Sequence, residues 1–302
     1  AEQCYRQADE LLRIVQTEEK DLDLNEAFAS LEIGYTRLHN ILKNYEQVYK
    51  VSSSAIKHAQ TLYDKNPEKY AYYYGFAYSE AASILNESRS DVPKAISYYN
   101  KARNIFQTAS AKDKIKAQQM IAGGYINTAA AYIYLGEYKK AQQYSDSVLA
   151  ITDLYMNANP CLFGPIEANA YSMLGVTHIA TNQVAKGIEQ FKKALAITDS
   201  LHITSDPYAT AQTLYRLCSC FPQIKNKREV EQYAVRAINL YNKLSYNSTY
   251  NEQLATCHIA LVLARYDLKE HIAMEKSIFN LLEYINRTKI PKIQFCIHGT
   301  PV

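Results

Sequence analysis

The chain has no tryptophan, and its 302 residues include only 9 glycines and 8 prolines. Glycine and proline interrupt helices, so their scarcity indicates that most residues lie in helix interiors joined by short turns. No apolar run reaches the roughly 18 residues that a membrane-spanning helix needs. We therefore expect an all-α fold and no membrane insertion by this segment.

An excess of one charge is also missing. The 33 basic and 30 acidic residues give a net charge of +3, and the basic residues form no block. Nucleic acids and anionic lipids are usually bound through concentrated Lys and Arg. We therefore expect no nucleic-acid partner for this segment.

The sequence lacks motifs that carry chemistry. It has no glycine-rich phosphate loop, no nucleophile elbow and no His-Glu metalloprotease helix. The seven histidines are widely spaced, and the only close cysteine pair, Cys218 and Cys220, would point to different faces of a helix. We expect no catalytic residue, metal or cofactor, and we interpret the six cysteines mainly as small buried hydrophobes.

What the sequence does contain is a repeat. Aliphatic residues recur at intervals of 43, 46, 46 and 43 residues, at Leu62, Ile105, Ile151, Ile197 and Leu240. Two columns of mostly small residues keep the same register, one at Ala59, Ala102, Val148, Ala194 and Ala237 and the other at Ser52, Ala95, Ala141, Gly187 and Val230. Small residues suit places where two helices touch. The period predicts a helical solenoid, in which each unit buries its apolar face against its neighbours.

Apolar periodicity divides the chain into a lone first helix and about six helical hairpins. The predicted domains are an N-terminal capping helix over residues 1–20, a solenoid over 21–288 and an irregular tail over 289–302. Gly136 fits the left-handed conformation that ends a helix. Between the third and fourth hairpins we expect a loop that contains Asn159-Pro160 and Gly164-Pro165.

The third and fourth hairpins share a motif. The first helix of each hairpin has a small residue, at Ala129 and Gly175, and a large residue three positions later, at Tyr132 and His178. The second helix has a small residue near its start, at Ala141 and Gly187, and a later position that is alanine in the motif, at Val148 and Ala194. In this pattern the chain resembles the tetratricopeptide repeat (TPR) family, over roughly residues 25–285. The early tryptophan of the motif is absent, and the period exceeds the usual value of about 34. The longer period resembles variants found in motor-cargo adaptors, bacterial peptide-sensing regulators and bacterial sensor regions. The resemblance implies a right-handed α-α superhelix.

The same resemblance implies a concave groove lined by the first helix of each hairpin. The groove positions map to Tyr35, Tyr78, Ile126, Tyr134, Asn169, Ser172, Gln212 and Tyr215. Amides at Asn169 and Gln212 would hold the backbone of an extended peptide, and tyrosines would grip its side chains. The alternative is that the amides are simply solvated and the tyrosines pack between helices. The groove lacks the lysine and asparagine of the clamp that binds chaperone C-termini, so we expect no chaperone-clamp function.

The leading hypothesis is a non-catalytic scaffold that binds a protein or peptide, as the sensor or adaptor region of a larger bacterial signalling or regulatory protein. Its compartment, periplasmic or cytoplasmic, and its self-association as a homodimer are left open. An alternative is a carbohydrate-binding outer-surface protein on a TPR-like scaffold, although sugar rings usually stack on aromatic platforms and tryptophan is absent. A third is an α-helical enzyme, which would need acidic residues clustered in a cleft.

Overall fold

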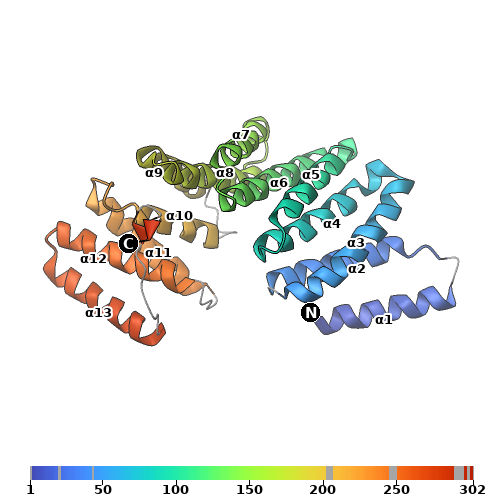
Figure 1. Ribbon diagram of the computed structural model, residues 1–302, viewed down its shortest axis with the longest axis horizontal. Helices are drawn as coiled ribbons and strands as arrows, with labels where there is room; N and C mark the ends of the chain where they lie inside the picture. Colours follow the sequence, from blue (N-terminus) through green and yellow to red (C-terminus); the bar gives the residue numbers. More distant parts are fainter. Residues whose placement is uncertain are drawn as a thin grey trace. The chain divides into compact units, whose positions relative to one another are not determined.

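A computed structural model describes residues 2–19, 22–42, 44–201, 207–244, 250–288, 296–297 and 300–301. Within these ranges lie thirteen α-helices (Figure 1). Their bounds are α1 (Glu2–Glu18), α2 (Asn25–Ile41), α3 (Tyr45–Lys65), α4 (Pro67–Glu87), α5 (Val92–Phe106), α6 (Lys114–Tyr134), α7 (Tyr138–Tyr155), α8 (Pro160–Ala180), α9 (Val184–Ser200), α10 (Pro207–Ser219), α11 (Lys227–Lys243), α12 (Asn251–Asp267) and α13 (His271–Thr288). The predicted all-α class is confirmed, with six successive helix pairs after α1.

Three short elements complete the described residues. The 3₁₀-helix η1 (Ala111–Asp113) precedes α6. Two strands, β1 (Cys296–Ile297) and β2 (Thr300–Pro301), pair antiparallel within the segment predicted as an irregular tail. The predicted domain boundaries at residues 20 and 288 stay predictions.

Local sequence signals explain several helix ends. Asn66 caps α4 by accepting a hydrogen bond from the Lys69 backbone N–H at 3.0 Å, and Asp91 caps α5 through the backbone N–H of Lys94, also at 3.0 Å. Both side chains satisfy donors that the first helical turn leaves free. Gly136, between α6 and α7, has a φ of +74°, as the sequence predicts for a residue that ends a helix.

The predicted loop around Gly164-Pro165 is wrong, because α8 begins at Pro160 and runs through both residues. Pro165 lies inside α8, where it lacks the N–H that would bond to the carbonyl of Cys161 and its ring crowds that carbonyl. Phe163 is fully buried and stacks on Tyr155 of α7 with a centroid distance of 5.3 Å. Burial of this ring stabilises the first turns of α8 against the breaking tendency of glycine and proline.

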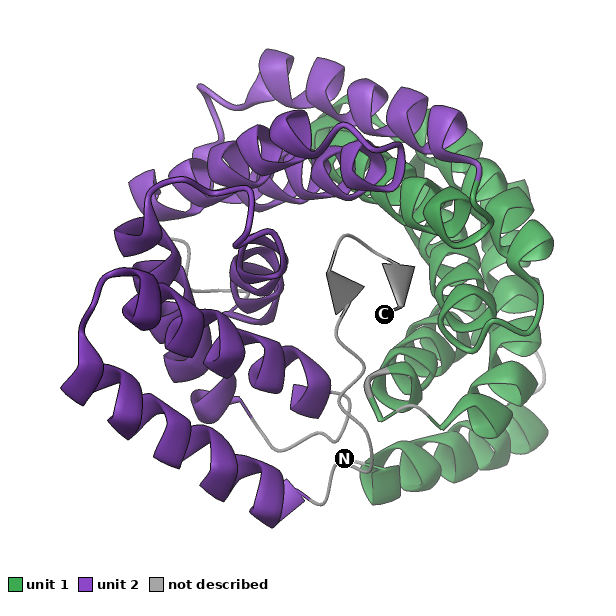
Figure 2. Ribbon diagram, turned by 60° about the vertical axis from the view of Figure 1, so that its left-hand side comes forward, with its two compact units in different colours: residues 1–136 green, residues 137–302 purple. Residues whose placement is uncertain are grey.

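The chain divides into two compact units, Ala1–Gly136 and Glu137–Val302 (Figure 2). In unit 1, α2 packs on α3, α3 on α4, α4 on α5 and α5 on α6. In unit 2, α7 packs on α8, α8 on α9, α10 on α11, α11 on α12 and α12 on α13. Most helices thus contact their neighbours in sequence, as expected of a helical repeat. Helix α1 has no buried residue and contacts α2.

The two predicted columns of small residues lie in the interior of the helical repeat. All ten residues are buried, and they lie on α3, α5, α7, α9 and α11. In the aliphatic column, Leu62 and Ile105 are buried and the other three are half-buried.

Of the cysteines with described side chains, Cys218, Cys220 and Cys257 are buried, whereas Cys4 and Cys161 are exposed. Across the described residues, no helix combines the length and the apolar character needed to cross a bilayer.

Candidate functional site

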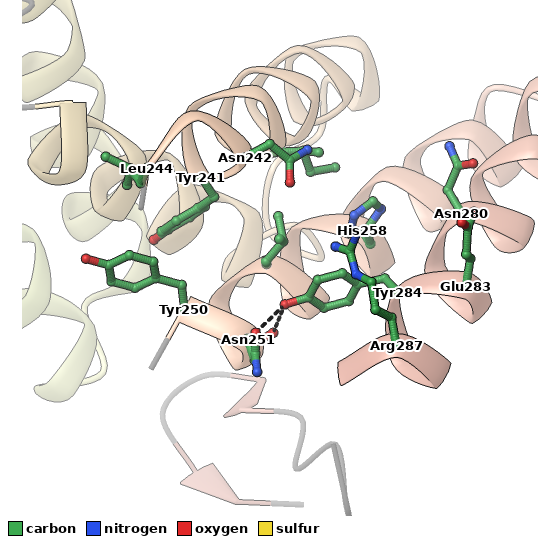
Figure 3. A pocket seen from close by; sticks show the side chains of 12 residues that line it. Tyr241, Asn242, Leu244, Tyr250, Asn251, His258, Asn280, Glu283, Tyr284 and Arg287 are labelled. Atoms are coloured by element: carbon green, nitrogen blue, oxygen red, sulfur yellow. Dashed lines mark hydrogen bonds between the residues drawn. The ribbon is translucent and has the colours of Figure 1, made fainter. Parts of the chain in front are cut away.

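Unit 2 contains a cavity of about 550 Å³ formed by α11, α12 and α13 (Figure 3). Aromatic and polar side chains share its wall, including Tyr241, Tyr250, Asn251, His258, Tyr284 and Arg287. This volume is within the range typical of ligand pockets, about 300–1,000 Å³.

One side of the cavity is fixed by Tyr284 of α13. Its hydroxyl donates to Oδ1 of Asn251, at the start of α12, over 2.9 Å (Figure 3). The His258 ring stacks on Tyr284 with centroids 5.6 Å apart, and the Arg287 guanidinium lies 5.8 Å from the Tyr284 centroid. These contacts tie α12 to α13 and hold the aromatic wall in one arrangement.

Two buried polar atoms of the wall have no hydrogen-bond partner within the described part of the chain, namely the Tyr241 hydroxyl and Nδ1 of His258. Burial lowers the pKa of His258 to about 4 and raises the pKa of Tyr241. Both groups are therefore neutral near pH 7. Buried polar groups in proteins are nearly always paired, so these two atoms are exceptions, and the side chains around them close both off from solvent.

A second polar cluster lies between α8 and α10. Nη1 of Arg216 donates to Oγ of Ser172 over 2.7 Å, and Nη2 donates to Oε1 of Gln212 over 3.5 Å. Nε2 of Gln212 in turn donates to the Tyr208 hydroxyl. We call these four residues, Ser172, Tyr208, Gln212 and Arg216, the Arg216 cluster.

The Arg216 cluster contains a positive charge and no negative one. Burial lowers the pKa of Arg216, and the groups that oppose this are the hydroxyls of Tyr215, Tyr241 and Tyr208. The salt bridges within the described ranges include none to Arg216. Its guanidinium is half-buried among neutral partners.

Tyrosine rings connect the cavity to the Arg216 cluster. Tyr250 lines the cavity, and its ring centroid lies 5.7 Å from that of Tyr241 and 5.1 Å from that of Tyr208. Tyr208 belongs to the Arg216 cluster through Gln212. The two features therefore share one aromatic wall in unit 2.

The structure brings two of the predicted groove residues together. Ser172 and Gln212 both contact Arg216, although Ser172 is only 3% exposed and its hydroxyl is used inside the protein. Tyr215 packs half-buried against the core of unit 2. Asn169, one turn before Ser172, lines a narrow cleft between α8, α9 and α10.

The predicted groove residues of unit 1 have separate neighbours. Tyr35 lies half-buried between α1 and α2. Tyr78 packs edge-on against Tyr98 of α5, with centroids 5.1 Å apart. Tyr134 is 50% exposed, and its ring centroid lies 4.6 Å from Cζ of the Arg89 guanidinium. None of the three lines the cavity of unit 2.

Sequence reasoning missed Arg216 and the cavity. A signal for Arg216 was available, because α10 contains neither Asp nor Glu and so offers the arginine no helical partner. No comparable signal marks Tyr241, His258 or Tyr284, which come together only through the packing of three helices. Among the side chains that the structure describes, no group of three or more His, Cys, Asp or Glu could hold a metal ion.

No family model matches the chain, and no curated protein is significantly similar to it. Solved structures are similar at low identity. BtubC (BKLC) from P. vanneervenii is 16% identical, with a TM-score of 0.62 over 82% of this chain and 92% of that one. A Rap protein complexed with competence and sporulation factor is 14% identical, with a TM-score of 0.53 over 95% and 74%. NprR in complex with its cognate peptide NprX is 14% identical, with a TM-score of 0.51 over 94% and 74%.

The chain has a TPR-like helical-repeat fold. At these identities the comparison establishes the fold alone. Any binding role must therefore be argued from the cavity and the Arg216 cluster.

Proposed function

We propose that this chain is a non-catalytic scaffold that binds an extended peptide at the cavity of unit 2, and that it serves as the sensor or adaptor region of a bacterial signalling or regulatory protein. The observation that carries the proposal is the cavity wall itself, in which tyrosine rings lie beside the exposed amide side chains of Asn242 and Asn280. NprR, which has a similar fold, was solved with its cognate peptide, and this supports the choice of ligand class.

A peptide suits this wall chemically. Tyrosine rings offer flat apolar surface at a low cost in side-chain entropy, and the side-chain amides of Asn242 and Asn280 can bond to backbone amides. A peptide side chain would enter the cavity while its backbone runs along the rim formed by Tyr250. Charged residues at the rim, Glu283 and Arg287, would contribute selectivity.

The carbohydrate alternative is less well supported by this geometry. A sugar needs an open aromatic face on which to stack. One face of Tyr284 is covered by the stacked His258 ring, and Tyr284 is only 6% exposed. The cavity therefore favours hydrogen bonding with side-chain insertion over sugar stacking.

The test is affinity selection of a random heptapeptide library on the immobilised chain. We expect the wild type to enrich specific peptides and Tyr250→Ala to bind them roughly tenfold or more weakly, since buried aromatic anchors dominate binding energy. Tyr266→Ala is the matched control, because Tyr266 lies on α12, the helix that Tyr250 directly precedes, is 61% exposed and does not line the cavity. Absence of enrichment, or equal loss in both variants, would contradict the proposal. Selective retention of an oligosaccharide would support the alternative.

A homodimer remains a prediction. Light scattering of the purified chain tests it, because the monomer has a mass of 34.4 kDa and a dimer would scatter as about twice that mass.

A further inference from the structure

Arg216 uses only part of its hydrogen-bonding capacity. A guanidinium carries five N–H donors in a planar fork. In the part of the chain that the structure describes, two of its nitrogens donate, one to Ser172 and one to Gln212. Both acceptors are neutral, and the remaining N–H groups have no protein partner there.

Such an arrangement costs stability. A buried cation is unfavourable unless an anion pairs with it, and arginine cannot escape by losing its proton. Unit 2 also shows what a paired arginine looks like. Nε of Arg265 lies 2.9 Å from Oε1 of Glu231, and its Nη1 donates to Ser277 over 2.6 Å. Among the described residues, Arg216 has no counterpart to Glu231.

We propose that Arg216 binds a carboxylate of the peptide ligand, with Ser172 and Gln212 holding the guanidinium in place. This inference rests on the proposed function. A planar guanidinium matches a carboxylate through two parallel N–H···O bonds, and neutral partners leave its charge available. The surrounding tyrosines Tyr208 and Tyr215 reduce the access of water, which strengthens such a pair.

The position of Arg216 relative to the cavity defines how a peptide would bind. Tyr250 lines the cavity and contacts the ring of Tyr208, whose hydroxyl accepts from Gln212. One side chain of the peptide would therefore lie in the cavity, the peptide would run along the aromatic wall, and a carboxylate of the same peptide would bind Arg216. The carboxylate would come from the C-terminus of the peptide or from an Asp or Glu side chain.

The first experiment needs no peptide. NMR follows the Nε–Hε signal of Arg216, which is assigned by its loss in Arg216→Gln. The protein is titrated with sodium acetate, and sodium chloride at equal ionic strength is the control. We expect a saturable shift with acetate and none with chloride. Equal effects of the two salts, or no shift, would overturn the proposal for Arg216 even if peptides bind the cavity. A saturable shift without retention of any peptide would instead overturn the proposed function.

The second experiment identifies the source of the carboxylate. Four heptapeptide libraries are used, with free or amidated C-termini and with or without Asp and Glu. Retention of each library is compared on the wild type, Arg216→Gln and Arg216→Lys. We expect libraries that carry a carboxylate to be retained roughly tenfold or more above the amidated library without Asp and Glu, and Arg216→Gln to abolish this difference. Arg216→Lys should restore it in part, because lysine keeps the charge and loses the fork.

A matched control for the second experiment is Arg236→Gln. Arg236 is on α11 and pairs with Asp199 on α9, so it has its own counter-ion. Preference for the free C-terminus alone would assign the terminal carboxylate, and preference for Asp or Glu in amidated peptides would assign a side chain. Equal retention of all four libraries by the wild type would overturn the role of Arg216 and leave peptide binding intact.

Discussion

Gly175 of α8 lies directly against the ring of Phe191 of α9. A Cβ atom added to Gly175 would lie 2.9 Å from Cζ of Phe191 and closer still to Cδ1 and Cε1. Phe191 is 1% exposed, so the ring has no free space into which it could move. Unit 1 repeats the relationship, since a Cβ at Gly75 of α4 would lie 2.8 Å from Cζ of Phe106 of α5. At both of these positions a glycine is therefore required by the aromatic side chain of the next helix.

Replacement of Gly175 tests this packing. Gly175→Ala should lower the free energy of unfolding by about 1–3 kcal/mol, because the added methyl overpacks a closed contact. Gly123→Ala is the control, since a Cβ at Gly123 of α6 would meet nothing within 4 Å. Alanine there should raise the free energy of unfolding by up to about 1 kcal/mol through helix propensity. Urea unfolding measures both, and equal stabilisation by the two substitutions would contradict the packing argument.

Arg216 and Arg265 of unit 2 should respond differently to removal of their charge. Arg265→Met should destabilise the protein by about 1–3 kcal/mol, because it removes one of the two arginine partners of the Glu231 carboxylate and the hydrogen bond to Ser277, and only Arg228 still pairs with Glu231. Arg216→Met should leave stability unchanged or raise it by up to about 1 kcal/mol, because it removes a half-buried charge that has no counter-ion among the described residues. Urea unfolding of the two variants measures this difference. A comparable loss in both would show that Arg216 has a structural role.

The cavity histidine should make stability depend on pH. Burial lowers the pKa of His258 from 6.5 to about 4, so between these values the unfolded chain binds more protons than the folded one. Stability should therefore fall as the pH drops through this window and level off below it, by about 3 kcal/mol at most. His258→Leu should reduce this slope in urea unfolding measured at several pH values. An unchanged slope would show that His258 is accessible to protons in the folded state.

Two cavity tyrosines offer a matched comparison of hydroxyl groups. Tyr241→Phe removes a buried hydroxyl without a partner and should leave the unfolding free energy unchanged or raise it by up to about 1 kcal/mol. Tyr284→Phe removes the hydrogen bond to Asn251 and should lower it by about 1 kcal/mol. Both keep the aromatic ring, so thermal or urea unfolding isolates the hydroxyl. The reverse order of stability would argue against Tyr241 as an unsatisfied group.

The fold was predictable because packing leaves a periodic record in the sequence. Buried residues such as Ala102 and Ala194 recur in register, and Gly136 marks a turn by a conformation that few other residues adopt. The start of α8 was not predictable in the same way. Local turn signals at Gly164-Pro165 are outweighed by the burial of Phe163, which is a tertiary effect.

The candidate site was less predictable than the fold. Motif mapping selected Ser172 and Gln212, which the structure brings to Arg216, but it gave the two residues no common partner. Whether any described carboxylate lies beside Arg216 depends on which helices pack together. The cavity depends on side chains of three helices, such as Tyr241 and Tyr284, whose proximity has no periodic signature.

Helix α1 contributes no buried residue and is held to α2 through contacts such as that between Tyr5 and Tyr35. Its amide hydrogens should therefore exchange with solvent through a local opening that costs far less than global unfolding. Each opening would expose Glu32 and Tyr35, which line a cleft together with residues of α1. Protection of the α1 amides from hydrogen exchange consequently measures how often that cleft is uncovered. It does not measure the free energy of cooperative unfolding of the helices that follow.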